Sequence, residues 1–485
     1  MSASTTSGLA RGTTIRLGPT VRRFSQGRLL FGGSPTRLLR LSPSASKLLS
    51  TTSQFTITDQ TTAALADSLL RYGLAEISSD HQGAALAELT VVVPVYESPR
   101  ALRRLLANLT GIRTIVVDDG SPDPLPLSEI ANEHGATLLR LDINAGPAAA
   151  RNHGLRSVTT PYVAFCDADT VVSRHDLQRL MNHFADARVA AVAPRILGLD
   201  TPNPNWITRY ENTRSSLDLG SISAIVQPHS RVGWVPAACL LARTDALGPG
   251  FDETMRVGED VDLVWRLAHT GRLVRYDANT TIYHEHRRTL RTWLTRKYRY
   301  GTSAAPLAQR HSTHVAPAVL SPALALTAAG LLLQRPWALL ASTAAFTLQA
   351  KQIRQELRRI DAPLSLTAEL TARTLANTLS QTSALLLRHW LPATLATAVV
   401  SRRARRAIAV AMLVDTITEY RTHKPAGSLA VHLAARRLDD AAYGLGVWHG
   451  ALRQRALTCL TPCLTSNRIC RRPPKNTACA DSVDS

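Results

Sequence analysis

Cysteine is scarce in this sequence, with six residues in 485. Small secreted domains that depend on disulfide bonds are far richer in cysteine, so we exclude a disulfide framework and expect the catalytic part in a reducing, cytoplasmic compartment. Cys166 lies inside an apolar run and is expected in the core. Four cysteines near the C-terminus lack the paired spacing and the histidines of a zinc site, and we interpret them as an incidental cluster: Cys459, Cys463, Cys470 and Cys479.

Acidic residues are also few, with 36 Asp and Glu against 56 Lys and Arg, a net charge of +20 and a pI near 10.5. Such an excess favours anionic partners: nucleic acid, an acidic membrane surface or phosphate-bearing substrates. The excess is mostly arginine, so part of it is also consistent with a GC-rich genome. No apolar run follows the Ser- and Thr-rich first dozen residues, and we therefore expect no signal peptide.

Residues 12–80 predict a small N-terminal module. Two short apolar runs occupy 28–34 and 37–41, and helical spacing follows over 63–70. A polar stretch near 78–83 then indicates a linker.

Residues 88–312 alternate between strand and helix patterns. The expected strands are 89–94, 114–117, 137–141 and 162–166, with a helix over 102–109 after the first of them. This rhythm predicts an α/β domain with a mainly parallel sheet and helices on both faces. Ligands of such sheets bind beyond the carboxyl ends of the strands.

Residues 313–455 are rich in Ala and Leu and predict a hydrophobic α-helical region, followed by a loose basic tail over 456–485. The uncharged run 315–333 is close in length to the ~20 residues needed to span a bilayer. Shorter apolar stretches, 336–350, 390–400 and 407–414, are expected to be interfacial helices or a packed bundle. We therefore predict attachment to the cell membrane, with the catalytic domain on the cytoplasmic side.

Asp167-Ala168-Asp169 follows the apolar strand 162–166. Two carboxylates in this position can share a divalent cation such as Mg²⁺ or Mn²⁺, which proteins hold with one or two carboxylates plus substrate phosphates. Such a cation absorbs the charge that develops on a diphosphate leaving group. Alone, the motif is weak and favours a turn of solvated acids, because many loops contain Asp-x-Asp.

Further acidic residues give this motif context. Asp118 and Asp119 end the strand 114–117, where a carboxylate can accept from a base or a ribose. Glu259 and Asp260 open an amphipathic helix, where the helix dipole keeps a carboxylate ionised. That position suits a general base that takes a proton from an attacking hydroxyl, although an ordinary acidic first turn looks the same.

Together these residues resemble family-two glycosyltransferases with the GT-A fold. Five motifs occur in the family's order within about 90–305: Val93-Pro94-Val95-Tyr96, Val117-Asp118-Asp119-Gly120-Ser121, Gly146-Pro147-Ala148-Ala149-Ala150-Arg151-Asn152, Asp167-Ala168-Asp169 and Gly258-Glu259-Asp260-Val261-Asp262.

The resemblance implies single displacement with inversion, with Asp260 as the base. It also implies a nucleotide-sugar pocket formed by Pro94, Tyr96, Asp118, Asp119, Arg151, Asp167, Glu259, Arg296 and Lys297. Asp167 and Asp169 would hold Mg²⁺ or Mn²⁺, with His284 of the His284-Glu285-His286 segment preferred over His286 as a further ligand. A surface histidine pair is the alternative.

Seven basic residues and no acidic one occur between Arg287 and Arg310. Arg296 and Lys297 belong to this segment and are expected to clamp a pyrophosphate, or else to contact anionic lipid headgroups. Basic and aromatic residues also alternate in nucleic-acid-binding proteins, but the acidic site and the adjoining hydrophobic region argue against nucleic acid as a partner.

Four further segments resemble the glycosyltransferases of mycofactocin biosynthesis over nearly the whole chain: 31–41, 215–220, 300–307 and 437–444. The resemblance implies transfer of glucose from UDP-glucose to a ribosomal-peptide-derived redox cofactor, building a β-linked oligosaccharide. It also implies that the N-terminal module is α+β and similar to PqqD, and that it grips a peptide as an added strand or meets biosynthetic partners. A structural cap on the transferase is the alternative.

Two other functions stay open. One is a membrane polysaccharide or lipid-phosphate glycosyltransferase of the same fold, although 295–300 lacks the Gln-x-x-Arg-Trp segment of processive synthases. The other is a non-catalytic scaffold that binds a peptide or a nucleotide, which the intact set of acidic residues disfavours.

Overall fold

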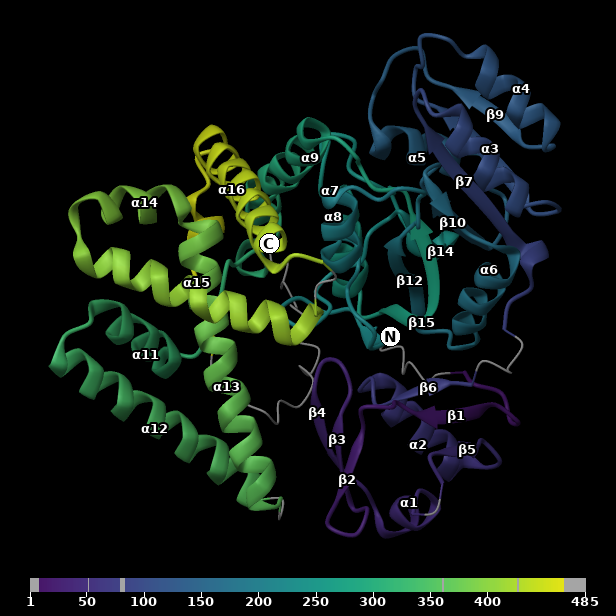
Figure 1. Ribbon diagram of the computed structural model, residues 1–485. Coiled ribbons are helices and arrows are strands. Elements are labelled where there is room, and N and C mark those ends of the chain that lie inside the picture. Colours follow the sequence, from purple (N-terminus) through teal and green to yellow (C-terminus); the bar gives the residue numbers. More distant parts are fainter. Residues whose placement is uncertain (1–7, 51, 79–82, 360–361, 425–426, 466–485) are drawn as a thin grey trace, which may run out of the picture.

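The structure, a computed structural model, describes residues 8–50, 52–78, 83–359, 362–424 and 427–465. These residues form three parts that lie side by side (Figure 1). A small N-terminal module lies below a large α/β domain, and a set of long helices lies beside both of them.

The N-terminal module is α+β and has its own core. Its strands make two three-stranded antiparallel sheets, of order β5-β1-β6 and β2-β3-β4. The Asp59 side chain accepts from Thr62 N at 2.8 Å and starts the longer helix as an N-cap. The elements are β1 (Thr14–Leu17), β2 (Arg22–Phe24), β3 (Leu29–Gly32), β4 (Arg37–Arg40), α1 (Pro43–Leu48), β5 (Gln54–Thr56), α2 (Gln60–Arg71) and β6 (Ala75–Ile77).

Polar and apolar contacts join this module to the other two parts. Arg188 of the α/β domain lies 2.7 Å from Asp67 of the module. Phe31 packs in a buried cluster with Ile353 and Leu357 of the long helix α12 (Pro336–Arg358). The predicted linker after Ser78 falls mostly on 79–82, which lie outside the described residues.

The α/β domain is built on a nine-stranded sheet of order β11-β15-β12-β14-β10-β7-β8-β9, with β13 beside β15. The four predicted strands are confirmed and their pairing is parallel, whereas β14 and β11 are antiparallel to their neighbours. The strands are β7 (Leu89–Val95), β8 (Arg113–Asp118), β9 (Thr137–Arg140), β10 (Tyr162–Cys166), β11 (Thr170–Val171), β12 (Val189–Gly198), β13 (Ala224–Ile225), β14 (Cys239–Arg243) and β15 (Leu273–His284).

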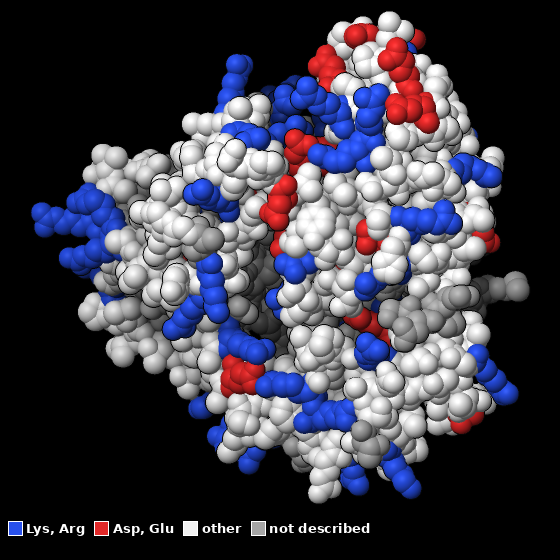
Figure 2. Space-filling model, turned by 45° about the vertical axis from the view of Figure 1, so that its right-hand side comes forward, with Lys and Arg blue, Asp and Glu red and all other residues white. Residues whose placement is uncertain are grey.

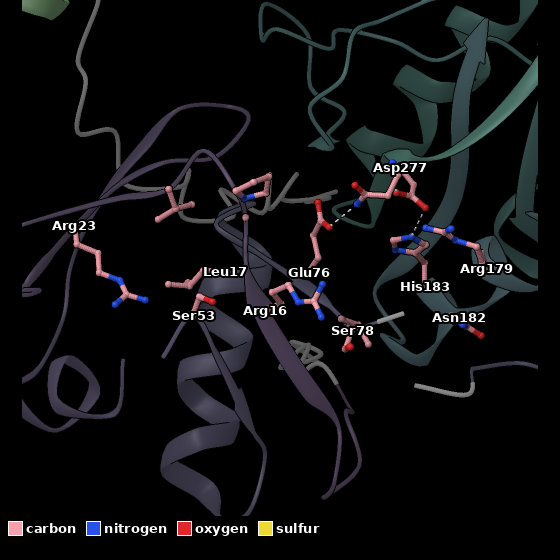
Figure 3. Close-up of a pocket in the computed structure, with 15 residues that line it drawn as sticks. Arg16, Leu17, Arg23, Ser53, Glu76, Ser78, Arg179, Asn182, His183 and Asp277 are labelled. Atoms are coloured by element: carbon pink, nitrogen blue, oxygen red, sulfur yellow. Dashed lines mark hydrogen bonds and ion pairs between the residues drawn. The ribbon is translucent and has the colours of Figure 1, made fainter. Parts of the chain in front are cut away.

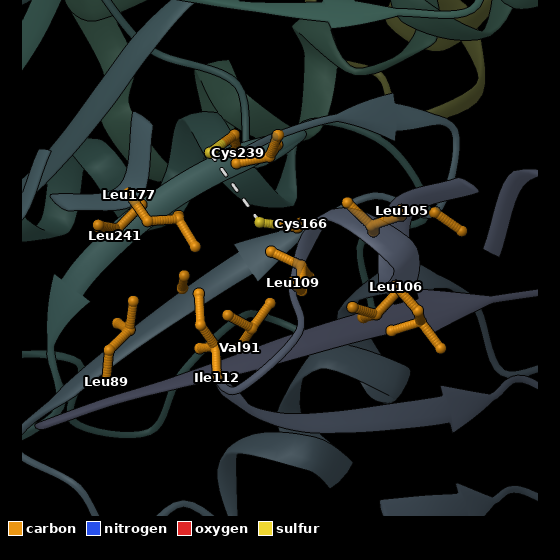
Figure 4. Packing of buried hydrophobic residues seen from close by; sticks show 14 of the residues in the cluster. Leu89, Val91, Leu105, Leu106, Leu109, Ile112, Cys166, Leu177, Cys239 and Leu241 are labelled. Atoms are coloured by element: carbon orange, nitrogen blue, oxygen red, sulfur yellow. Dashed lines mark hydrogen bonds between the residues drawn. The ribbon is translucent and has the colours of Figure 1, made fainter. Parts of the chain in front are cut away.

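Helices pack on both faces of this sheet, and each face buries a hydrophobic cluster. Leu102, Leu105 and Leu106, spaced on one face of α3, enter the first cluster (Figure 4). Cys166 is fully buried as predicted, with its sulfur 4.0 Å from that of Cys239 on β14. The helices are α3 (Pro99–Asn108), α4 (Leu125–Glu133), α5 (Pro147–Leu155), α6 (Arg174–Met181), α7 (Trp206–Arg214) and α8 (Glu259–His269).

Helices make up the remainder of the chain. They are α9 (Leu290–Thr302), α10 (Ala304–His311), α11 (Pro322–Leu333), α12, α13 (Leu364–Ala384), α14 (Leu391–Val400), α15 (Arg402–His423) and α16 (Leu429–Arg453). Glycines let α9 and α16 approach closely, because a Cβ on Gly446 would lie 2.0 Å from the carbonyl oxygen of Tyr298. This contact fastens the C-terminal helices to the α/β domain.

The apolar run 315–333 is not one helix. A short strand, β16 (Val319–Leu320), precedes α11, whose 12 residues extend about 18 Å. Within the described ranges, no single helix is long and apolar enough to cross a bilayer, while α13 and α14 together reach the required length but are bent by 88°.

The prediction of a loose tail from 456 is wrong for its first ten residues. Cys459 is buried in a cluster with Val447 and Ala451, and β17 (Cys463–Leu464) pairs with β16. Apolar burial and this strand pairing hold the segment against the domain. Cys470 and Cys479 lie outside the described residues.

Candidate active site

Asp167 and Asp169 lie in the turn between β10 and β11, at the carboxyl end of a central strand. The amide of Asp167 donates to Ala238 O at 2.9 Å, which ties the turn to the segment before β14. Strand β11 then pairs with the end of β15, so that Thr170 lies opposite His284. Backbone pairing thus brings the sequence-distant His284 beside the acidic turn.

His284 Nε2 lies 3.3 Å from Asp169 Oδ1. His284 is 3% exposed, and among the described residues its ring nitrogens have no hydrogen-bond partner beyond this contact with Asp169. Burial opposes the charge on Asp169, but His284 and Arg296 more than offset this and hold the pKa of the carboxyl well below its usual range. A buried imidazole beside an ionised carboxylate is a pair of ligands that suits a divalent cation.

His286 is a separate case from His284. Burial and the nearby charges of His284 and Lys297 lower its pKa to about 4, so the ring is neutral at pH 7. Its Nε2 is also buried and has no hydrogen-bond partner in the described part of the chain, but the interaction with Asp169 is made by His284.

Arg151 lies at the centre of the acidic residues. Its guanidinium donates to Asp167 Oδ1 at 2.7 Å and to Glu259 Oε1 at 2.8 Å, and the side chain is 4% exposed. The predicted direct contact of Arg151 with the nucleotide-sugar is therefore not what this geometry favours, because both carboxylates occupy the guanidinium. Arg151 instead fixes the strand-end turn to the start of α8.

Asp260 is the second residue of α8 and is half-buried. Its carboxylate accepts from Val261 N at 2.8 Å and from Ala237 N at 3.3 Å. Burial and the neighbouring charge of Glu259 raise its pKa to about 7. A carboxylate with this pKa takes up protons near neutral pH, as a general base requires.

Asp118 and Asp119 hold the loop after β8 together. Asp118 is fully buried and pairs with Arg140 at 2.5 Å. Asp119 accepts from the amides of Ala145 and Gly146 at 2.8 and 2.9 Å, and burial raises its pKa against these hydrogen bonds. The geometry gives Asp118 a supporting position behind Asp119.

Tyr96 and Pro94 lie at the end of the neighbouring strand β7. Tyr96 is 41% exposed and Pro94 is half-buried, so both are accessible to a ligand. Gly120 has φ +71°, and a Cβ there would lie 2.5 Å from the backbone of Ile143. Only glycine therefore allows the loop after β8 to contact the loop after β9.

Arg296 and Lys297 are adjacent on α9 but face different surroundings. Arg296 bonds to Tyr300 Oη at 2.6 Å; although burial opposes its charge, Tyr300 and Asp169 raise the pKa of the guanidinium. Lys297 is 3% exposed and lies 2.8 Å from Glu211 and 3.3 Å from Asp439 of α16. That Lys297 binds the nucleotide-sugar stays a prediction; in this structure buried ion pairs with Glu211 and Asp439 occupy its ammonium group.

Two contributions to the site carry no clear signal in the sequence. Ala237 N reaches Asp260 from the loop before β14, and a backbone amide leaves no trace in composition. Arg287 Nη2 lies 3.6 Å from Asp169 Oδ2, and only its place in the basic segment 287–310 pointed to it. Across the part of the chain that the structure describes, no three His, Cys, Asp or Glu side chains converge as a ready metal site.

A cavity of 570 Å³ lies apart from these residues, between the N-terminal module and the α/β domain (Figure 3). Arg16 and Glu76 line it from the module, and Arg179 and His183 line it from the domain. His183 Nε2 lies 3.3 Å from Asp277 Oδ2 at its wall. Its described lining does not include Asp119, Asp167, Asp169 or Asp260.

Comparison with known proteins places this arrangement in a family. Residues 90–235 match the model of glycosyl transferase family 2. The chain is 39% identical over 465 residues to a pre-mycofactocin glycosyltransferase of Mycobacterium tuberculosis, covering 94% of this chain and 98% of that relative. It is 29% identical over 186 residues to the succinoglycan biosynthesis protein ExoU of Rhizobium meliloti, covering 36% of this chain and 53% of ExoU.

Among solved structures, the mannosyltransferase PcManGT from Pyrobaculum calidifontis aligns with 70% of this chain and 88% of its own, at 16% identity and a TM-score of 0.36. The mixed α/β domain has a GT-A-like glycosyltransferase fold, and the likeness to the mycobacterial relative extends over the N-terminal module and the C-terminal helices as well. The chain therefore belongs to the pre-mycofactocin glycosyltransferases, within glycosyltransferase family 2.

Proposed function

We propose that the chain transfers a hexose from a nucleotide-sugar to a peptide-derived acceptor by single displacement, with inversion at the anomeric carbon. The observation that carries this proposal is the position of Asp260. Its pKa of about 7 and its hydrogen bonds to Ala237 and Val261 leave a carboxylate that is oriented yet able to accept a proton.

In the proposed reaction Asp260 removes the proton from the acceptor hydroxyl as its oxygen attacks the anomeric carbon. The bond from that carbon to the diphosphate oxygen breaks on the opposite face, which inverts the configuration. Glu259 keeps the pKa of Asp260 raised, and Arg151 holds Glu259 in place. The base therefore depends on a buried ion pair between Arg151 and Glu259.

A divalent cation, Mg²⁺ or Mn²⁺, fits the residues at the end of β10. Asp169 and His284 supply a carboxylate and an imidazole that lie 3.3 Å apart, and Asp167 is close by in the same turn, held by Arg151. When bound, the cation would neutralise the diphosphate that leaves the sugar. Because no three His, Cys, Asp or Glu side chains converge within the described ranges, we expect substrate phosphates and water to complete the shell.

Several side chains are placed to bind the rest of the donor. Tyr96 offers an exposed ring and Pro94 a half-buried one at the end of β7, and Asp119 offers a carboxylate at the end of the adjacent strand β8. Arg296 and Arg287 add positive charge near Asp169, where a diphosphate would lie. We propose UDP-glucose as the donor, as the family resemblance implies.

We propose that the acceptor is pre-mycofactocin, the molecule in the name of the mycobacterial relative, and that it receives β-linked glucose units.

The N-terminal module has two proposed roles. Its ion pair to Arg188 and its packing on α12 support a structural cap, whereas the 570 Å³ cavity beside β6 supports a binding role for a peptide or a biosynthetic partner.

A donor screen tests the reaction. The purified chain is incubated with UDP-, GDP- and TDP-hexoses, Mn²⁺ or Mg²⁺, and a small-molecule extract of the native host, and products are identified by mass spectrometry. A mass increase of one or more hexoses that requires Asp260 supports the proposal. Transfer only to lipid phosphates or to a growing polysaccharide would replace it with the alternative enzyme of the same fold.

A further inference from the structure

Two helix turns lie side by side at the edge of the C-terminal helices. One turn joins α11 to α12 at Gln334 and Arg335, and the other joins α14 to α15 at Ser401. Gln334 Nε2 donates to Arg403 O at 2.9 Å and connects them. Both turns point to the left edge of the molecule in Figure 1.

These turns expose large apolar side chains. Val399 and Val400, the last two residues of α14, are 80% and 86% exposed. Trp337 and Leu340 in the first turns of α12 are 65% and 73% exposed. Four such side chains around two adjoining turns form a patch of the kind that marks an interaction surface.

Arginines surround the apolar patch. Arg335, Arg402, Arg403, Arg405 and Arg406 are all exposed, and Figure 2 shows a group of basic side chains at the left edge of the molecule. The sequence has no Asp or Glu between Glu285 and Glu356, or between Glu369 and Asp415. The charge around the turns is therefore entirely positive within these segments.

A hollow of 300 Å³ opens between the two turns. Leu332, Leu333 and Ala407 give it apolar walls, and Thr397 and Arg403 lie at its polar side. An apolar chain attached to a phosphate group has the matching chemistry, with hydrocarbon against the leucines and the phosphate near Arg403.

We propose that these two turns dock on an anionic lipid bilayer. Val399, Val400, Trp337 and Leu340 insert below the headgroups, and the five arginines contact lipid phosphates. A second copy of the chain is a poor occupant, because a two-fold interface would set the same arginines against each other. The proposal is independent of the reaction proposed above.

Vesicle co-sedimentation of the full chain tests the surface. Vesicles made of equal parts phosphatidylglycerol and phosphatidylcholine are compared with phosphatidylcholine alone. One variant changes Val399 and Val400 to Asp, and a second changes Arg402, Arg403, Arg405 and Arg406 to Ala. Matched controls are Leu125→Asp, at a position 67% exposed on the α/β domain, and the combined change of the exposed Arg11, Arg28, Arg40 and Arg113 to Ala.

The expected result is binding to the anionic vesicles that weakens about tenfold or more in both turn variants, but little in the controls. Circular dichroism melting shows whether each variant is folded. Turn variants that bind like the wild type would overturn the proposal, as would equal losses in the matched controls. If the wild type does not bind vesicles but forms dimers, and the turn variants are monomeric, the proposal is overturned and the patch is an interface between two copies of the chain.

Discussion

Arg151 Nη1 lies 2.8 Å from Glu259 Oε1, and this buried contact links the start of α8 to the strand-end turn of β10. The two residues are 108 positions apart in the sequence. The same guanidinium holds Asp167, so one arginine orients carboxylates from two segments of the site.

Replacing Arg151 with Met should lower the free energy of unfolding by about 3–5 kcal/mol, because two buried or half-buried carboxylates lose their partner. Urea denaturation followed by circular dichroism measures the change. Arg156→Met, on the next turn at a side chain 63% exposed, should cost about 0.5 kcal/mol or less. Equal losses of unfolding free energy at both positions would show that the buried ion pairs of Arg151 contribute no more to stability than an exposed arginine does.

Asp260→Asn should reduce kcat by roughly 10²-fold or more, since the amide cannot accept the acceptor's proton. Its oxygen can still accept from Val261 N, so the start of α8 should keep its structure. Calorimetric titration with UDP and Mn²⁺ should give nearly the wild-type affinity. A comparable loss of UDP binding would make Asp260 a donor ligand rather than the base.

The pH dependence of kcat should follow Asp260. The folded pKa is raised to about 7, so the protonated, inactive form dominates below that value and activity should rise through it. Glu259→Gln removes a negative charge that raises this pKa, and should therefore move the midpoint to lower pH. An unchanged midpoint would mean that another group limits the rate.

Substitution of the two histidines should separate their roles. His284→Ala should raise the Mn²⁺ concentration needed for half-maximal binding in the presence of UDP, measured by electron paramagnetic resonance, and Asp169→Ala should abolish that binding. His286→Ala is the matched control, because the ring next to Asp169 is that of His284. If His286→Ala weakened Mn²⁺ more than His284→Ala, the assignment would be reversed.

Gly446→Ala should lower the Tm even though Ala favours helices by about 1 kcal/mol over Gly. Its Cβ would lie 2.0 Å from the Tyr298 carbonyl oxygen, so α9 and α16 would have to separate. Differential scanning fluorimetry measures the shift. Arg299→Ala, on an exposed position of α9, should leave the Tm almost unchanged, and a stabilised Gly446 variant would contradict the packing.

Local pattern was sufficient for the four parallel strands β7, β8, β9 and β10 and for the position of the acidic residues at their carboxyl ends. Continuous apolar runs predict β7, β8 and β10 closely, because strands buried on both faces need apolar side chains throughout. The run 137–141 also predicts β9, whose side chains are half-buried or exposed. Parallel strands bring their carboxyl ends to one edge, so Asp119 and Asp167 were expected on the same side of the sheet. The identity of that edge follows from the sequence alone.

Tertiary structure decided which of these side chains are available to a ligand. Lys297 and Arg151 look like cationic ligands in the sequence, but buried carboxylates from α7, α8 and α16 bind them. His284 was distinguished from His286 by the pairing of β11 with β15. Ion pairs and strand registers between distant segments leave no local pattern, since they depend on how helices and strands meet after folding.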